Sequence, residues 1–213
     1  SGFEAGLGEL RLLPGPGGIA GAVAGLGNGK TRKRQRFGLA KALASLPAGD
    51  WHLVGDLTGA ERTEAGLAAL LSAYSFDRYR PGKAAKPVVR LRAPDGVDAA
   101  HLIAMAEGEF LTRDLINTPA QDMGPDQLEE AFRSLAKRHK AKVTVVRGDD
   151  LLGANFPMIH AVGRASPRAP RLLEMTWGKS GPHLTLVGKG VCFDTGGLNI
   201  KPSSGMLLMK KDM

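Results

Sequence analysis

The stretch HLTLVGKGVCFDTGGLNIKP, residues 183–202, decides the fold, because an apolar run passes straight into a glycine-rich turn that carries two lysines and one aspartate. The apolar run predicts a strand, which would bring the polar residues to the edge of a sheet, where α/β proteins build their sites. Glycines on both sides of Lys189 permit unusual backbone angles and close approach. We therefore expect an α/β fold with its chemistry gathered behind this strand.

Helix-like and strand-like segments alternate along the rest of the chain, which is the pattern of an α/β layer. The turn sequence APDGVD at 93–98 separates a small N-terminal α/β domain, residues 1–93, from a second part, residues 94–213, that begins with a long connector helix. The expected helices span 33–46, 60–76, 99–117 and 125–140, and the expected strands span 51–56, 86–92, 142–147, 157–164, 171–177 and 183–188.

Composition indicates a globular protein, with 43% hydrophobic and 23% charged residues in a chain of 213. The net charge of +8 is compatible with nucleic acid as a partner, although basic runs are more often solvated faces. The single cysteine, Cys192, excludes an internal disulfide and suits a reducing cytoplasm. No apolar stretch approaches the roughly 20 residues of a membrane span. We expect a cytoplasmic protein that does not enter membranes.

Three weaker patterns favour ordinary structural roles. AGLGNGKT at 24–31 fits a loose phosphate-binding loop, but the segment before it is a poor central strand. The five histidines show no paired zinc spacing, and His160 lies in an apolar run where it reads as structural. Cys192 has no histidine nearby in the sequence, so we expect a buried, unreactive thiol.

The lysines and carboxylates of residues 189–212 allow two interpretations. Asp194 and Asp212 are residue types that bind divalent cations, and a carboxylate can bridge a pair of metals. A lysine beside a cation is a neutral amine ligand, whereas a lysine that keeps its charge stabilises an oxyanion. The alternative is a set of surface ion pairs around a glycine-rich turn.

The segment GKGVCFDTGGLNIKPSSGMLLMKKDM, residues 188–213, closely resembles the signature of the leucyl aminopeptidase family, the dinuclear cytosol aminopeptidases. RDLINTPAQDMGP at 113–125 resembles the family's entry to the catalytic domain, and HAVGRASPRAPRLLEMTW at 160–177 resembles its next pair of strands. The resemblance covers roughly residues 95–213. It implies that the second part of the chain is the first part of a mixed-sheet metallo-aminopeptidase domain.

The resemblance also implies a role for each matching residue. Lys189 and Asp212 would bind one metal ion, Asp194 would bridge two, and Lys201 would be the catalytic lysine. The cofactors would be two divalent ions, Mn²⁺ or Zn²⁺ or else Mg²⁺, with bicarbonate in the complete enzyme. The substrates would be peptides with a free N-terminus, cleaved to release leucine-type residues, and the complete enzyme would be a homo-hexamer.

One part of the family's pattern has no counterpart here. The family carries a later Asp-x-Glu-Gly-Arg segment, and no Asp-x-Glu occurs in these 213 residues. Glu107 and Glu109 flank a glycine within the connector helix and lack the arginine. We therefore expect the chain to be a fragment of a longer enzyme and to be inactive alone. The alternative is a DNA-binding or structural role for a catalytically incomplete basic chain.

Overall fold

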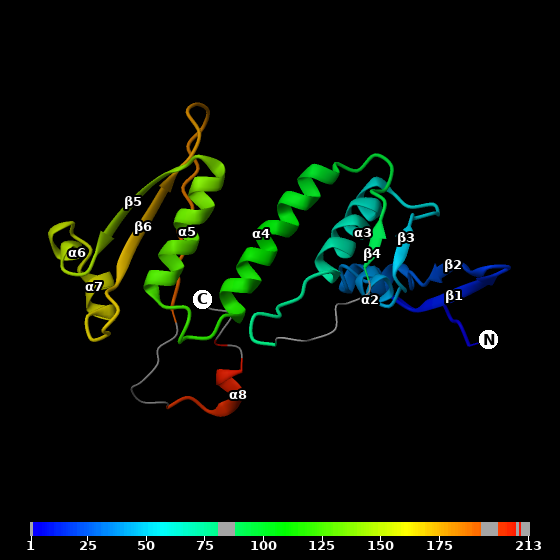
Figure 1. Ribbon diagram of the computed structural model, residues 1–213, viewed down its shortest axis with the longest axis horizontal. Coiled ribbons are helices and arrows are strands. Elements are labelled where there is room, and N and C mark those ends of the chain that lie inside the picture. Colours follow the sequence, from blue (N-terminus) through cyan, green and yellow to red (C-terminus); the bar gives the residue numbers. More distant parts are fainter. Residues whose placement is uncertain (1, 81–87, 193–199, 208, 210–213) are drawn as a thin grey trace. The chain divides into compact units, whose positions relative to one another are not determined.

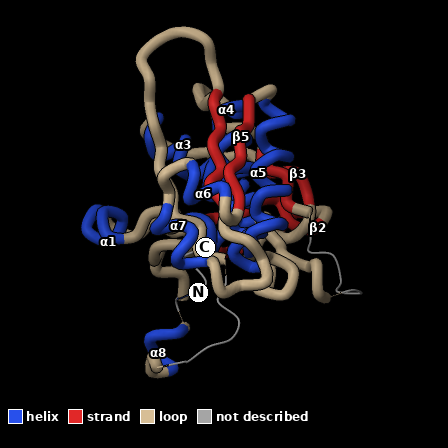
Figure 2. Tube along the Cα trace, turned by 90° about the vertical axis from the view of Figure 1, so that its left-hand side faces the viewer, coloured by secondary structure: helices blue, strands red, loops and turns tan. Residues whose placement is uncertain are grey.

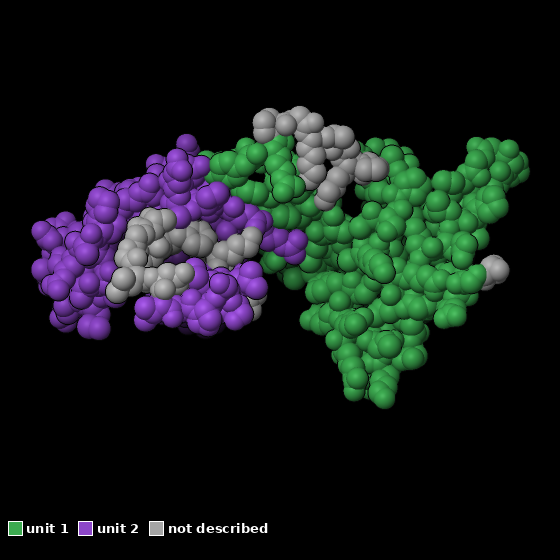
Figure 3. Space-filling model, turned by 90° about the horizontal axis from the view of Figure 1, so that it is seen from below, with its two compact units in different colours: residues 1–112 green, residues 113–213 purple. Residues whose placement is uncertain are grey.

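The computed structural model describes residues 2–80, 88–192, 200–207 and 209. The chain divides into two compact units, residues 1–112 and 113–213, which Figure 3 shows in separate colours. In chain order the elements (Figure 1) are β1 (Leu10–Gly15), β2 (Gly18–Ala24), α1 (Gly29–Arg34), α2 (Leu39–Ala44), β3 (Gly49–Trp51), α3 (Gly59–Ser72), β4 (Val89–Leu91), α4 (Ala99–Asn117), α5 (Pro125–His139), β5 (Lys142–Arg147), α6 (Asp150–Gly153), α7 (Pro157–Gly163), β6 (Arg171–Thr176) and α8 (Ser203–Met206).

The first unit combines an antiparallel hairpin with a parallel pair of short strands. β1 and β2 pair from Leu10 opposite Ala24 to Gly15 opposite Gly18. β3 and β4 pair in parallel, with Trp51 opposite Leu91, and α3 lies between them in the sequence. A strand, a helix and a parallel strand form the βαβ arrangement that the alternating sequence pattern predicts. The α/β fold class is confirmed.

The core of the first unit lies along α3. Ala65 and Ala68 of this helix are 2% and 0% exposed. A side chain at Gly66 would meet Leu102 of α4 at 3.0 Å, so the absence of a side chain there lets the two helices approach closely. Small residues on one face of α3 therefore allow its neighbours to pack against it.

A capping box fixes the start of α3. The Glu61 backbone N–H donates to Thr58 Oγ1 at 3.3 Å, and Glu61 Oε2 accepts from both the N–H and the hydroxyl of Thr58 at 2.9 Å. These bonds satisfy backbone donors that the first turn of a helix otherwise leaves unpaired.

Replacing Thr58 with Ala should lower the free energy of unfolding by about 1 kcal/mol, because the cap is lost while the exposed position tolerates alanine. Denaturant unfolding followed by circular dichroism measures this change. Thr63→Ala is the matched control, since among the described residues the Thr63 hydroxyl bonds only to the Gly59 carbonyl of its own helix. Equal losses for both variants would contradict a special role for the cap.

In the second unit, α5 packs against the antiparallel pair of β5 and β6 (Figure 1). The two strands pair Lys142 with Thr176 and Arg147 with Arg171, and α6 and α7 lie between them in the chain. Pro125 stands in the first turn of α5, as the sequence predicts. The helix ends where Lys140 adopts a left-handed backbone conformation with φ of 55°.

The sequence-based expectations for residues 157–164 and 33–46 are wrong. The segment 157–164, expected as a strand, forms α7, because Pro157 suits a first helical turn and β5 pairs directly with β6 instead. The helix expected over 33–46 is split into α1 and α2. At the break, Phe37 has φ of 57°, and its N–H donates to Glu64 Oε1 at 2.8 Å instead of continuing a helix.

The expected strands at 51–56 and 183–188 also differ from the structure. The first shifts to Gly49–Trp51. The second is a loop (Figure 2), and no backbone hydrogen bond joins it to another described residue. A strand requires a neighbour to take up its backbone donors and acceptors, so the apolar pattern alone does not produce one here. Within the described ranges, no helix has both the length and the apolar character needed to cross a bilayer.

Candidate functional site

Two of the four predicted site residues fall within the described part of the chain. Lys189 and Lys201 are both exposed. Asp194 and Asp212 lie outside the described residues, so the structure tests neither their geometry nor their approach to the lysines. Among the residues that are described, no three His, Cys, Asp or Glu side chains come together as a metal site.

The backbone beside Lys189 lies against α5. A side chain at Gly190 would come within 2.9 Å of Leu128 Cδ2, so only glycine permits this approach without a shift. A side chain at Gly188 would meet no atom within 4 Å. The segment around Lys189 is therefore held on one side by α5 and is open next to Gly188.

Cys192 lies two residues after Gly190, within the same unit. Its side chain is half-buried, and burial raises the pKa of the thiol, while the positive charges of Arg171 and Arg168 act in the opposite direction. A raised pKa keeps the thiol protonated near neutral pH, which makes it a poor nucleophile. The sequence predicts a buried thiol, and the structure finds it half-buried.

Lys201 is placed by the turn that leads into α8. Pro202 is extended, with φ of −63° and ψ of 150°, and it directly precedes the helix. The Lys201 ammonium donates to the sulfur of Met209 at 3.4 Å. A thioether is a weak acceptor, so the ammonium remains available to a stronger partner.

A buried carboxylate organises the same unit. Glu129 of α5 has a side chain only 3% exposed, and it pairs with Arg133 at 2.7 Å, with Arg171 at 2.7 Å and with Arg147. Arg171 also pairs with Asp126 at 2.5 Å. The bond from Arg147, the largest cause, and those from Arg133 and Arg171 together lower the pKa of Glu129 to about 2 against the opposing effect of burial.

These ion pairs fix α5 on the β5–β6 strand pair. Glu129 and Asp126 come from the helix, while Arg147 and Arg171 come from β5 and β6. Arg168 holds the chain before α5, since it donates to the carbonyls of Ala120 and Gln121 at 3.3 and 3.0 Å. Because Gly190 lies against Leu128, the helix held by these contacts is also the support of the backbone beside Lys189.

Glu129→Gln should lower the free energy of unfolding by about 3 kcal/mol at neutral pH, because it removes the buried carboxylate that pairs with three arginines, one of which is itself only 7% exposed. The folded pKa of Glu129, about 2, lies below its ordinary 4.5. Its contribution is therefore fully present above about pH 4.5 and is lost as the pH falls toward 2.

Denaturant unfolding at several pH values between 2 and 7, spaced by about one pH unit, measures how the free energy of unfolding depends on pH. Glu130→Gln, at the exposed neighbouring position, is the matched control and should behave as the unchanged protein. A Glu129→Gln variant that lost stability on acidification as steeply as the unchanged protein would contradict the assignment.

The weaker sequence patterns have structural roles in the described chain. His160, now on α7, lies with its Nε2 3.0 Å from Asp149 Oδ1. In the sequence that resembles a phosphate-binding loop, the Asn28 side chain accepts from the N–H groups of Lys30 and Thr31 at 3.0 Å. Those N–H groups are therefore already bonded, which argues against a phosphate site there.

Sequence reasoning missed the cluster around Glu129. The available signal was an acidic residue on the apolar side of an amphipathic helix, followed by strands that each carry an arginine at one end. Nothing in a single sequence says that these two strands pair in the register that brings Arg147 opposite Arg171.

Comparison with known proteins assigns both units. Residues 1–94 match the M17 aminopeptidase, N-terminal domain, and residues 110–213 match the cytosol aminopeptidase family, catalytic domain. The chain belongs to the cytosol aminopeptidase family. The resemblance inferred from residues 188–213 is thereby confirmed, and it extends to the N-terminal unit, which the sequence motifs did not identify.

Curated relatives of this chain come from more than one organism. It is 36% identical to a "Probable cytosol aminopeptidase" of Leifsonia xyli over its whole length, covering 45% of that protein. It is also 36% identical to one of Aeropyrum pernix, with 96% of the chain and 42% of the relative covered. The chain thus spans about half the length of the curated relatives it matches.

Solved structures agree with this assignment. The crystal structure of a cytosol aminopeptidase from Coxiella burnetii has a TM-score of 0.84 and 38% identity, covering all of this chain and 46% of that one. The bottromycin maturation enzyme BotP, solved in complex with Mn, has a TM-score of 0.79 and 33% identity, covering all of this chain and 48% of that one.

Proposed function

We propose that the protein is a metal-dependent aminopeptidase that releases leucine-type residues from the free N-termini of peptides. The observation that carries the proposal is the agreement of two independent matches, one for each unit, with the lysine–aspartate motif of residues 188–213. The manganese in the related BotP structure supports a divalent cation as the cofactor. By the same family likeness, the complete enzyme is a cytoplasmic homo-hexamer.

Lys189, Asp194 and Asp212 are the residues that would hold the metal ions. An amine and two carboxylates form a donor set suited to divalent ions such as Mn²⁺ or Zn²⁺. The described residue of the three, Lys189, is exposed, and none of the described residues forms an ion pair with it. Its amine is therefore available as a ligand. When bound, two divalent cations supply Lewis acidity and lower the pKa of water.

Lys201 is the proposed catalytic lysine. Its charged ammonium would polarise the carbonyl of the first peptide bond and stabilise the negative charge that develops on that oxygen. The weak thioether contact of its Nζ supports this role, because little is lost when a carbonyl oxygen takes the place of Met209. Bicarbonate, expected in the complete enzyme, would belong with the Asp-x-Glu-Gly-Arg segment that these 213 residues do not contain.

Lys201→Ala in the complete enzyme should lower kcat by about 100-fold or more, as expected when one group that stabilises an oxyanion is removed. Metal content should stay near that of the unchanged enzyme. Lys189→Ala should instead lower metal content and activity together. Steady-state kinetics and metal analysis by mass spectrometry measure both quantities on the same samples.

Lys179→Ala is the matched control for these two variants, because Lys179 is exposed and stands outside the motif. It should change neither quantity. If Lys201→Ala lost metal in proportion to activity, Lys201 would be a ligand or a structural residue, and its proposed catalytic role would be wrong.

The 213-residue chain by itself should not hydrolyse leucine p-nitroanilide, because it contains no Asp-x-Glu pair to complete the donor set. The complete enzyme should lose activity with a chelator and recover it when Mn²⁺ is added. Robust metal-dependent hydrolysis by the 213-residue chain would show that its own residues are sufficient for activity. It would overturn the proposal that the site also needs an Asp-x-Glu segment.

A further inference from the structure

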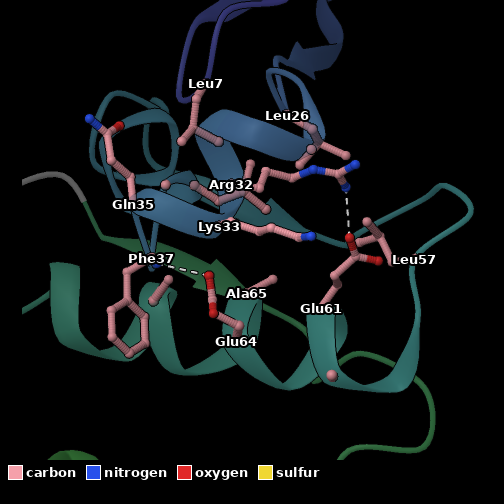
Figure 4. A pocket seen from close by; sticks show the side chains of 15 residues that line it. Leu7, Leu26, Arg32, Lys33, Gln35, Phe37, Leu57, Glu61, Glu64 and Ala65 are labelled. Atoms are coloured by element: carbon pink, nitrogen blue, oxygen red, sulfur yellow. Dashed lines mark hydrogen bonds and ion pairs between the residues drawn. The ribbon is translucent and has the colours of Figure 1, made fainter.

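The N-terminal unit contains an open pocket of about 350 Å³ that belongs to none of the residues proposed for peptide hydrolysis (Figure 4). Its volume lies within the range of about 300–1,000 Å³ that is usual for small-molecule sites. All of the residues that line it lie between positions 7 and 68. The pocket is therefore a feature of the first unit alone.

The floor of the pocket is apolar. Leu57, Ala65 and Ala68 lie 9%, 2% and 0% exposed beneath it. Leu7 and Phe37 add half-buried apolar surface at its sides. A ligand that fits this floor must present an aliphatic body, since a polar group placed here would lose its hydration without gaining a hydrogen bond.

Both carboxylates in the pocket are already bonded. Glu61 accepts from Arg32 at 2.7 Å and from the capping residue of α3. Glu64 accepts from the Phe37 N–H at 2.8 Å and from Arg36 at 3.4 Å. These carboxylates have little capacity left for a cationic ligand, so an ammonium group is a poor match to the pocket.

Lys33 is different. It lines the pocket next to the Arg32–Glu61 pair (Figure 4), and it forms no ion pair with any described residue. Glu61 pairs with Arg32, and Glu64 pairs with Arg36, which does not itself line the pocket, so Lys33 is the lining cation that these ion pairs leave over. The pocket therefore offers one unneutralised cation above an aliphatic floor.

We propose that this pocket binds a small aliphatic monocarboxylate, with its carboxylate on the Lys33 ammonium and its branched chain over Ala65 and Ala68. A neutral ligand of the same shape would cover the ammonium without pairing it, which is unfavourable. A phosphate would carry more negative charge than one lysine neutralises, and the nearby helix N–H groups are taken up by Asn28. The proposal does not depend on the peptidase activity.

The test uses 4-methylpentanoate as the probe and 4-methylpentanamide as its uncharged counterpart, with the intact protein in isothermal titration calorimetry and ligand-observed NMR. The carboxylate should bind about tenfold or more tightly than the amide, because a hydrogen bond to a charged group is stronger than a neutral one. Lys33→Met should weaken carboxylate binding by a similar factor and leave amide binding nearly unchanged.

Two further variants separate the pocket from general effects. Lys30→Met removes a charge from the same helix at a position that does not line the pocket, and it should leave carboxylate binding unchanged. Ala60→Leu places a larger side chain in the pocket from an exposed position of α3 and should weaken binding of both probes. Circular dichroism confirms that each variant is folded.

Three results would overturn the proposal. The first is no detectable binding of 4-methylpentanoate at concentrations on the order of ten millimolar, which corresponds to a negligible affinity for a ligand of this size. The second is equal binding of acid and amide. The third is a Lys33→Met variant that binds the acid as tightly as the Lys30→Met control.

Discussion

The second unit depends on the burial of one negative charge. Glu129 lies almost fully out of solvent, and taking a carboxylate out of water is unfavourable by several kcal/mol unless its partners replace the lost hydration. Arginines from two strands and from its own helix replace it. The helix cannot slide along the two strands without separating these charges, so the network fixes the position of α5 more than it adds stability.

The ion pairs of Glu129 also affect the candidate site, because α5 contacts the segment that carries Lys189. Gly190 approaches Leu128 on the helix that carries Glu129, and Cys192 is half-buried near Arg171. The backbone that carries Lys189 therefore rests on α5 at Leu128, and the next residue of that helix, Glu129, forms the ion pairs that fix the helix in place. A lysine proposed as a metal ligand needs this support, because a ligand on a free loop loses conformational entropy on binding.

The sequence carried enough information for the fold class, the long helices and the β5 and β6 strands, since their apolar periods are clear and Pro125 marks a helix start. It failed where two structures fit one short apolar run, as at 157–164. It also failed at Phe37, where a hydrogen bond to Glu64, 27 positions away, interrupts a helix. Tertiary contacts of this kind leave no local trace in one chain.

For the candidate site, the sequence led to the family, while the roles of Lys189, Asp194, Lys201 and Asp212 stay predictions. The residue types of 188–213 alone left surface ion pairs open as an alternative, and the family followed from the resemblance of this segment to its signature. The pocket of the first unit was not predictable, since its lining comes from separate parts of the chain, at residue 7, residues 26–39 and residues 57–68, and includes alanines with no pattern of their own. A contiguous motif is visible in the sequence, whereas the pocket of the first unit forms only when the chain folds.

The apolar run that precedes Lys189 has a practical consequence. Leu184, Leu186 and Val187 are 83%, 85% and 94% exposed, and no backbone hydrogen bond joins their segment to another described residue. An extended apolar segment with free backbone groups is a template for pairing with another chain. This segment is therefore the part of the described chain that best suits self-association in concentrated solution.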